Sequence, residues 1–127
     1  MTLPDDPAAR KEYPLYSGFM RYFPAAIAAV AHHSYVSNQR HNPGMPLCHD
    51  RLKSADEPDA LLRHLMEGDY VGTAWRAMAL LQKHLEANGA PIAPAAINVV
   101  VPVLPTLHEC LEARASDELG LNNGEAV

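Results

Sequence analysis

The chain has only two cysteines, and it has no long apolar stretch. Cys48 and Cys110 lack CxxC spacing and are too few for a disulfide framework, so we expect a reducing compartment, with a single Cys48–Cys110 bridge as the alternative. No apolar run approaches the roughly 18 residues of a membrane span, and no charged-then-apolar leader opens the sequence. The sequence therefore predicts a cytoplasmic protein with no membrane partner.

Basic residues are also scarce. Ten Lys and Arg stand against fifteen Asp and Glu, for a formal charge of -5. A protein that coats nucleic acid needs a dense basic face, so this balance argues against a nucleic-acid partner. A small phosphorylated metabolite remains compatible with it. At 127 residues, 48% of them hydrophobic, the chain is expected to form one domain, 1–127, with a single core.

Eleven prolines punctuate the chain and delimit three predicted helices. The first runs from Pro24 to about Asn38, since proline suits the first turn of a helix. The second begins at a capping box in which Ser54 precedes Glu57 by three residues. The third spans 70–87 and stops at Asn88-Gly89. These elements predict an all-α protein, a small helical bundle with its core in about 13–88.

Helical periodicity assigns an apolar face to each of these helices. The residues expected to face the core are Ile27, Val30, Ala31, Ser34 and Tyr35, then Leu61, Leu62, Leu65 and Met66, and finally Val71, Ala74, Trp75, Met78, Leu81 and Leu85.

The pattern changes after Gly89. Residues 97–103 are rich in β-branched side chains, but Pro102 and Pro105 limit them to an edge strand or an extended arm. Residues 106–115 predict a last helix. Because small helical domains often complete their core by oligomerising, we expect this C-terminal arm, within 89–127, to pack on a second subunit of a homo-oligomer.

Aromatic residues crowd one segment near the N-terminus. Tyr13, Tyr16, Phe19, Tyr22 and Phe23 fall within eleven positions. Aromatic side chains mostly supply buried area, so a lid over the core is the favoured interpretation. The alternative is a wall on which a nucleobase stacks.

Polar side chains gather between the first two helices. Asn42-Pro43-Gly44 and Pro46 force turns there. Loops longer than about 12 residues tend to be functional or disordered. The polar residues of this loop are His41, Asn42, His49, Asp50, Arg51 and Lys53, and they favour a functional loop over a solvated connector.

Two carboxylates lie one turn apart where the second helix begins. Asp56, Asp59 and Arg63 share one helix face, because they follow each other at three and four residues. Divalent Mg²⁺ and Mn²⁺ prefer oxygen ligands, so a metal clamp is one interpretation. The other is that acidic residues complement the helix dipole. Because neighbouring helix positions lie about 100° apart, at most one of His32 and His33 is expected to join Asn38's side of any site.

The motifs HNPG, PL, R-x-KS, D-x-x-D and RHL occur in this order in residues 41–65, and AWRAMALLQ follows from Ala74. Over roughly 13–86 the chain resembles phage dATP/dGTP diphosphohydrolases, relatives of the all-α MazG-like nucleotide pyrophosphohydrolases. The resemblance implies hydrolysis of a purine deoxynucleoside triphosphate to the monophosphate and pyrophosphate, with Mg²⁺ or Mn²⁺ as cofactor.

The resemblance also implies roles for particular residues. The metal ligands that it implies are His32, Asp56, Asp59 and Asp69. The substrate-binding residues are Asn38, His41, Asn42, Lys53, Arg63 and Trp75. Catalytic roles fall to His32, Lys53 and Asp59, with His32 as a candidate general base. The chain departs from the family pattern at two positions, since His32 stands where we expect Glu and Asp69 where His is common.

Two other functions fit the sequence. The first is a catalytically silent, nucleotide-binding or oligomeric helical module that has lost the leading glutamate. The second is a zinc protein, for which the ligand-rich residues are His32, His33, His41, Cys48 and His49. These residues lack a regular Cys/His spacing.

Overall fold

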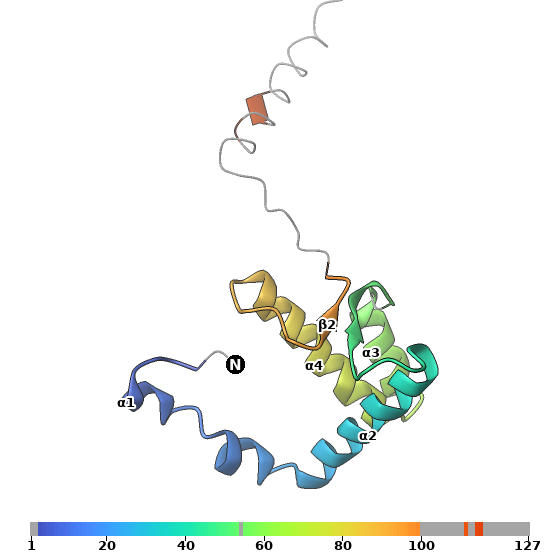
Figure 1. Ribbon diagram of the computed structural model, residues 1–127, viewed down its shortest axis with the longest axis horizontal. Helices are drawn as coiled ribbons and strands as arrows, with labels where there is room; N and C mark the ends of the chain where they lie inside the picture. The colour runs from blue at the N-terminus through green and yellow to red at the C-terminus, as the bar shows by residue number, and fades with distance from the viewer. Residues whose placement is uncertain (1–2, 54, 100–110, 112–113, 116–127) are drawn as a thin grey trace, which may run out of the picture.

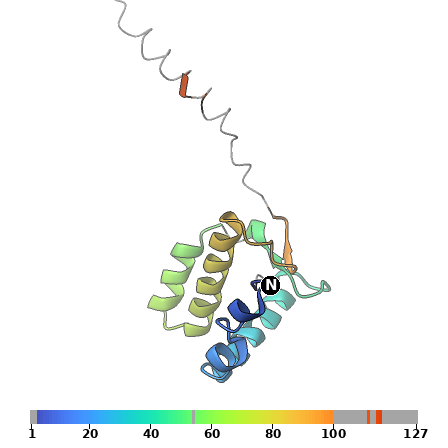
Figure 2. The same cartoon turned by 90° about the vertical axis from the view of Figure 1, so that its left-hand side faces the viewer.

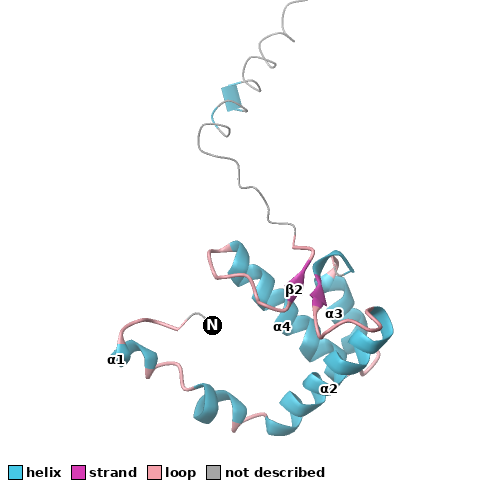
Figure 3. Cartoon of the chain, viewed as in Figure 1, coloured by secondary structure: helices cyan, strands magenta, loops and turns pink. Residues whose placement is uncertain are grey.

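The structure, a computed structural model, describes residues 3–53, 55–99, 111 and 114–115. The element order is α1 (Pro7–Arg10), η1 (Tyr16–Met20), α2 (Pro24–His41), β1 (His49–Asp50), η2 (Arg51–Lys53), α3 (Glu57–Met66), α4 (Tyr70–Ala87) and β2 (Ala96–Ile97). Helices dominate, and α3 and α4 pack side by side with α2 crossing next to them (Figures 1 and 3). The predicted all-α class is confirmed.

Helix α2 begins where the sequence predicts and ends later. Pro24 occupies the first turn, and the helix continues to His41 rather than stopping near Asn38. Asn42 ends the helix with a φ of -132°. It precedes Pro43, whose ring disfavours the helical conformation in the preceding residue. Gly44, with φ +77°, then turns the chain back toward β1. The polar side chains of the last α2 turns thereby face the following loop.

Helix α3 begins at Glu57, with Asp56 in the N-cap position. The predicted capping box is therefore wrong, because Glu57 is the first helical residue and its carboxylate pairs with Lys83 and Arg76; Ser54 itself lies outside the described residues. Pro58 sits in the first turn as expected. The Asp56 carboxylate makes no capping bond to the backbone and instead accepts from Nη2 of Arg63 at 2.9 Å.

Helix α4 spans Tyr70–Ala87, as the sequence predicts. Asp69 caps its first turn by accepting from the Gly72 amide, and Asn88 and Gly89 end it, the glycine at φ +101°. Gly89 adopts the left-handed conformation, which is energetically unfavourable for residues that have a Cβ.

Two short strands join the loop after α2 to the segment after α4. β1 and β2 pair in parallel, with His49 opposite Ala96 and Asp50 opposite Ile97. Side-chain support comes from Asn98, whose Nδ2 donates to Oδ1 of Asp50 at 3.1 Å. Of the predicted extended segment 97–103, the first residue is therefore in a strand of the chain's own small sheet, and 100–103 lie outside the described residues. The predicted helix 106–115 also lies largely outside them.

The contact between α3 and α4 is charged. Glu57 on α3 is 3% exposed, and its carboxylate meets Nζ of Lys83 at 2.7 Å and Nη1 of Arg76 at 3.5 Å. Among the described residues, Ala60 and Ala79 are the hydrophobic side chains that are buried. Small side chains on both helices allow the close approach, and ion pairs occupy the space between them.

A second buried ion pair attaches η2 to the end of α4. Arg51 binds Glu86 in a forked arrangement, at 2.8 and 3.1 Å, and both side chains are less than a tenth exposed. The Glu86 carboxylate also accepts from Gln82 and from the Ala93 amide. The bond from Arg51 is the main cause that lowers the pKa of Glu86 to about 2. The carboxylate therefore stays ionised in its buried position.

The predicted apolar faces of α3 and α4 are wrong for six residues, which are 46–87% exposed. They are Leu62, Leu65, Met66, Met78, Leu81 and Leu85. On α2 the prediction is also wrong for Ala31 and Tyr35, which are exposed, whereas Ile27, Val30 and Ser34 are half-buried. The other predicted residues of α3 and α4, Leu61, Val71, Ala74 and Trp75, are half-buried. Between α3 and α4 the buried positions are occupied by small or charged residues, Ala60, Ala79 and Glu57.

The aromatic segment near the N-terminus does not cover the core of its own chain. Tyr16 is 69% exposed, Tyr22 is 70% exposed, and the other aromatic residues of the segment are exposed as well. The segment leads away from α3 and α4 and joins the rest of the protein through α2 (Figures 1 and 2). The favoured prediction of a lid is therefore wrong for the single chain. Within the described residues, no helix combines the length and the hydropathy needed to span a bilayer.

Candidate functional site

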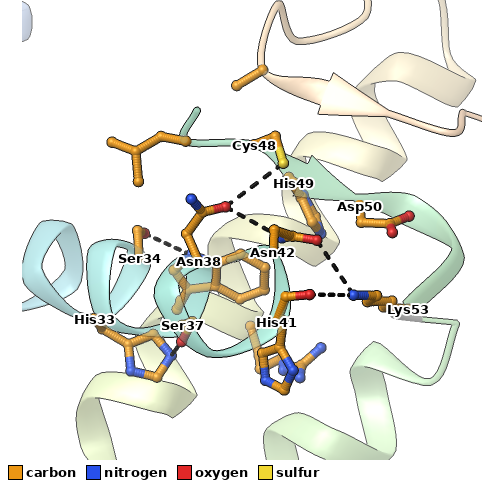
Figure 4. A pocket seen from close by; sticks show the side chains of 14 residues that line it. His33, Ser34, Ser37, Asn38, His41, Asn42, Cys48, His49, Asp50 and Lys53 are labelled. Atoms are coloured by element: carbon orange, nitrogen blue, oxygen red, sulfur yellow. Dashed lines mark hydrogen bonds between the residues drawn. The ribbon is translucent and has the colours of Figure 1, made fainter. Parts of the chain in front are cut away.

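A pocket of about 360 Å³ opens where α2, β1, η2 and α4 meet. Its lining residues are His33, Ser34, Ser37, Asn38, His41, Asn42, Leu47, Cys48, His49, Asp50, Lys53, Trp75, Arg76 and Ala95. Figure 4 shows the side chains of α2 and of the loop converging on it. This volume falls in the range of small-molecule sites, about 300–1,000 Å³. Five of the six predicted substrate-binding residues line it: Asn38, His41, Asn42, Lys53 and Trp75.

Asn38 holds the loop that forms one wall of the pocket. It is 5% exposed, and its Nδ2 donates to the carbonyls of Met45 at 3.0 Å and Pro46 at 3.4 Å. Its Oδ1 accepts from Asn42 at 3.2 Å and lies 3.7 Å from Sγ of Cys48 (Figure 4). Since the amide is occupied by these bonds, Asn38 shapes the pocket through the loop.

Lys53 brings a positive charge to the end of α2. Its Nζ donates to the His41 carbonyl at 2.6 Å and to Oδ1 of Asn42 at 3.3 Å (Figure 4). A cation suits this position because helix carbonyls at a C-terminus carry partial negative charge. An ammonium has three N–H donors, so two bonds fix Lys53 at the rim and one donor remains for a ligand.

Trp75 forms the aromatic floor of the pocket. Its Nε1 donates to Oγ of Ser34 at 3.0 Å, the ring of His49 stands edge-on at 4.8 Å between centroids, and the Arg76 guanidinium lies 5.4 Å from the Trp75 ring centre. Arg76 is also tied to Glu57. A cation beside an aromatic surface is a combination that binds the phosphate and base of a nucleotide.

His49 has a buried polar atom with no partner in the structure. Its Nε2 is inaccessible and makes no hydrogen bond within the described residues. Burial is the main cause that lowers the pKa of His49, and the nearby charges of Arg51 and Lys83 act in the same direction. The imidazole is therefore neutral near pH 7. A neutral ring can accept a proton or a hydrogen bond from a ligand.

Asp50 is the carboxylate that lines the pocket. The bond from Asn98 and a bond from the Leu52 amide at 3.1 Å both lower its pKa. The sequence predicts that Asp50 and His49 lie in a polar loop. Neither is among the predicted metal ligands or substrate-binding residues. Their positions depend on β1 pairing with β2, for which the sequence carries no local signal.

The predicted metal carboxylates Asp56, Asp59 and Asp69 lie outside the pocket lining. Asp56 is 55% exposed and paired with Arg63, which is 61% exposed. This bond from Arg63 is the main cause that lowers the pKa of Asp56. Asp59 stands in the same first turn of α3 and is exposed. Arg63, the sixth predicted substrate-binding residue, thus faces a carboxylate away from the pocket.

Asp69 makes a local contact with the end of α3. Its Oδ1 accepts from the Gly72 amide at 2.9 Å, and its Oδ2 lies 2.8 Å from Nδ1 of His64. The bond from Gly72, followed by the contact with His64, lowers its pKa. A Cβ on Gly72 would come within 2.7 Å of Nδ1 of His64, so the glycine is what permits this contact.

The histidines are divided between the pocket and the surface. His32 is exposed and stacks on Tyr35 at 6.4 Å, away from the pocket, whereas His33 lines it. Four of the five candidate zinc ligands line the pocket. Across 3–53 and 55–99, however, no three His, Cys, Asp or Glu side chains are grouped so that they could hold a metal ion.

Fold and site together define a small helical protein with a largely apolar pocket that also carries polar and cationic side chains beside an aromatic floor. The chain matches no model of a known protein family, no curated protein and no solved structure. The likeness to diphosphohydrolases therefore rests on sequence motifs, and its functional implications are proposals.

Proposed function

We propose that the chain is a MazG-like nucleotide pyrophosphohydrolase that binds dGTP or dATP in this pocket and hydrolyses it to the monophosphate and pyrophosphate. The observation that carries the proposal is the convergence of Asn38, His41, Asn42, Lys53 and Trp75 on one cavity. They come from α2, the loop, η2 and α4. Asn38, His41 and Asn42 share one helix end, so the informative members are Lys53 and Trp75, which reach the same cavity from η2 and α4.

The pocket suits both ends of a nucleotide. Trp75 and His49 offer ring surfaces to a purine, and base–aromatic stacking contributes about 1–3 kcal/mol per base. Lys53, Arg76 and Ser37 also line the pocket, and the two cations would meet the charge of phosphate oxygens. His32 is exposed and stacks on Tyr35, so His33, which lines the pocket, is the candidate general base in its place.

The proposed hydrolysis needs a divalent metal ion, which would bind partly to the phosphates of the substrate. Mg²⁺ keeps several waters and often binds through one or two carboxylates plus substrate phosphates. Asp50 is the pocket's carboxylate for such an ion. Asp56 and Asp69 already bind Arg63 and His64, so they fit the role less well, and Asp59 is the remaining candidate from the motif. A bound ion would neutralise the triphosphate and assist departure of pyrophosphate.

The second candidate is a module that binds nucleotide without hydrolysing it. The observation that favours it is the engagement of Asp56 by Arg63 and of Asp69 by His64 within the same chain. Such a protein would retain the pocket and lack turnover. Binding and hydrolysis therefore have to be measured separately.

Nucleotide binding has an internal reporter, because Trp75 is the single tryptophan of the chain and it lies in the pocket. We expect dGTP to change its fluorescence in a saturable manner. Lys53→Ala should weaken binding about tenfold, the loss of one charged contact worth roughly 1.4 kcal/mol. The matched control Lys11→Ala removes an exposed lysine next to α1 and should bind as the unmodified chain does. Absence of binding would overturn both candidates.

Hydrolysis is measured as pyrophosphate release from dGTP, dATP and the pyrimidine triphosphates, with and without Mn²⁺. Asp50→Asn and Asp59→Asn are compared in the same assay. We expect activity to require metal and to be lost in Asp50→Asn. Loss in Asp59→Asn instead would assign the metal to α3. Binding with no turnover under any condition would select the silent module.

A further inference from the structure

A chain of hydrogen bonds runs from the buried Asn38 to the ammonium of Lys53 at the rim of the pocket (Figure 4). Asn42 is its middle member. Nδ2 of Asn42 donates to Oδ1 of Asn38 at 3.2 Å, and Oδ1 of Asn42 accepts from Nζ of Lys53 at 3.3 Å. The sequence resemblance implies that Asn42 binds the substrate itself. Its side-chain oxygen is instead engaged by a residue of its own chain, so a different role fits it better.

The direction of these bonds is fixed at the buried end. An amide side chain has two N–H donors and one oxygen with two lone pairs. Nδ2 of Asn38 donates to two carbonyls of the loop, those of Met45 and Pro46. Its Oδ1 accepts from Asn42 and from the thiol of Cys48. The reverse orientation would set the side-chain oxygen against two carbonyls and leave buried polar groups without partners, which is costly. Asn38 therefore presents an acceptor to Asn42.

The orientation of Asn38 determines that of Asn42. Because Asn42 faces an acceptor, its amide turns Nδ2 toward Asn38, and its Oδ1 then faces Lys53. An ammonium only donates, so a reversed Asn42 would present N–H groups to a cation. The carbonyl of His41 is the second acceptor, at 2.6 Å from Nζ of Lys53. Lys53 is an exposed residue, and two oxygens of α2 and its C-cap nevertheless hold its ammonium in place.

We propose that Asn42 is a positioning residue for Lys53. Oriented by Asn38, it holds the ammonium so that the third N–H donor is set for a phosphate oxygen of the bound nucleotide. This inference rests on the proposed function, because the phosphate belongs to the ligand proposed there. A free lysine side chain samples many rotamers, and ordering it during binding lowers affinity. A lysine that its own chain has already ordered loses less freedom when the phosphate arrives, so the nucleotide binds more tightly.

A double-mutant cycle in dGTP binding tests the positioning role, with Trp75 fluorescence of the full chain as the readout. Asn42→Ala should weaken binding about fivefold, the value of one ordinary hydrogen bond. In the Lys53→Ala background the same change should have no further effect, because no ammonium is left to position. The matched control is Gln39→Ala, which removes an exposed amide of the same helix and should bind dGTP as the unmodified chain does.

The cycle separates positioning from two other roles of Asn42. If Asn42 contacted the ligand directly, or if it only supported the loop, its loss would weaken binding in the Lys53→Ala background as well. Losses that multiply in the double variant would therefore overturn the positioning role. Binding by Asn42→Ala at the affinity of the unmodified chain would overturn it too.

The hold on Lys53 can also be measured without nucleotide. Acylation by an N-hydroxysuccinimide ester at about pH 8, followed by peptide mass spectrometry, gives a rate for each lysine of the full chain. An amine whose N–H groups are engaged must break those bonds before it attacks, so Lys53 should react about fivefold faster in Asn42→Ala. The exposed Lys11 is the internal reference and should keep its rate. Equal Lys53 rates in the two chains would overturn the positioning role. A faster rate in a chain that binds no dGTP would overturn the proposed function and the role of the third donor, and only the hold on Lys53 would remain.

Discussion

In this chain charged side chains lie between the helices, where apolar residues are usual, and large apolar side chains lie on the surface. Between α3 and α4 lie Glu57, Lys83 and Arg76, and next to them Arg51 and Glu86, all in ion pairs. Large apolar side chains of residues 13–23 and of the sides of α3 and α4 that face away from their contact are exposed to solvent. The comparison teaches that the described helices meet through ion pairs and small side chains, while much of their apolar surface stays open to solvent.

The largest effect should follow from breaking the best-buried ion pair. Glu86→Ala leaves the Arg51 guanidinium buried without its partner, and we expect a loss of about 3–5 kcal/mol in the free energy of unfolding. Urea denaturation followed by circular dichroism measures it. The matched control is Asp56→Ala, which breaks the exposed pair with Arg63 and should cost about 1 kcal/mol or less.

A double change tests whether the charge itself is needed. Arg51→Met with Glu86→Leu replaces the pair with apolar side chains of similar volume, and it should recover most of the stability that Glu86→Ala loses. Equal losses of unfolding free energy in Glu86→Ala and Asp56→Ala would show that the buried ion pair contributes no more to stability than the exposed one.

Acid should act on the same pair. The pKa of Glu86 is lowered from 4.5 to about 2 in the folded chain, so its contribution is complete above pH 4.5 and is lost as the pH falls from 4.5 toward 2. We expect a loss on the order of 2–3 kcal/mol over this interval. Urea midpoints measured at several pH values for the unmodified chain and for Glu86→Gln isolate the effect. A pH dependence that is the same in both would refute it.

A smaller effect is expected where α3 meets α4. Gly72→Ala places a Cβ against His64 and Asp69, and overpacking of this kind costs about 1–3 kcal/mol. The sign is informative, because glycine to alanine inside a helix otherwise stabilises by up to about 1 kcal/mol. Thermal unfolding gives the sign directly, and a raised midpoint would show that His64 and Asp69 move apart at no cost.

The smallest effect belongs to the exposed side of α2. Tyr35→Ser removes a side chain that is 53% exposed, and the free energy of unfolding should change by no more than about 0.5 kcal/mol. The urea midpoint provides the measurement. A loss above 2 kcal/mol would mean that the exterior of the single chain contributes as strongly as its interior.

The helices could be predicted from local signals. Pro24 marks the start of α2, and Asn88 with Gly89 marks the end of α4, because both effects act within one turn of the chain. Which side of each helix is inside could not be predicted. Apolar periodicity identifies a side to be buried, but Glu57 and Arg51 occupy the interior of this chain because each finds an opposite charge far away in the sequence.

The pocket shows the same limit. Asn38, His41 and Asn42 lie within one helix end, so a short motif is enough to place them together. Lys53 joins them through the His41 carbonyl. The contact of His49 with Trp75 depends on how β1 is held, which no motif encodes. The predicted metal carboxylates lie on α3 and at its junction with α4. Asp56 pairs with Arg63, and Asp69 pairs with His64. These pairs depend on where the side chains point, which the spacing of the residues in the sequence does not give.

The parallel pairing of β1 with β2 has a consequence for how the protein is made. The His49 amide donates to the Ala95 carbonyl, so the loop beside the pocket is anchored by residues that the ribosome adds long after that loop has been synthesised. Contacts of such sequence separation form slowly. A nascent chain released only through α4 would hold Trp75 at the floor of the pocket, and the loop that carries His49 would gain its anchor only after residues 95–97 have emerged.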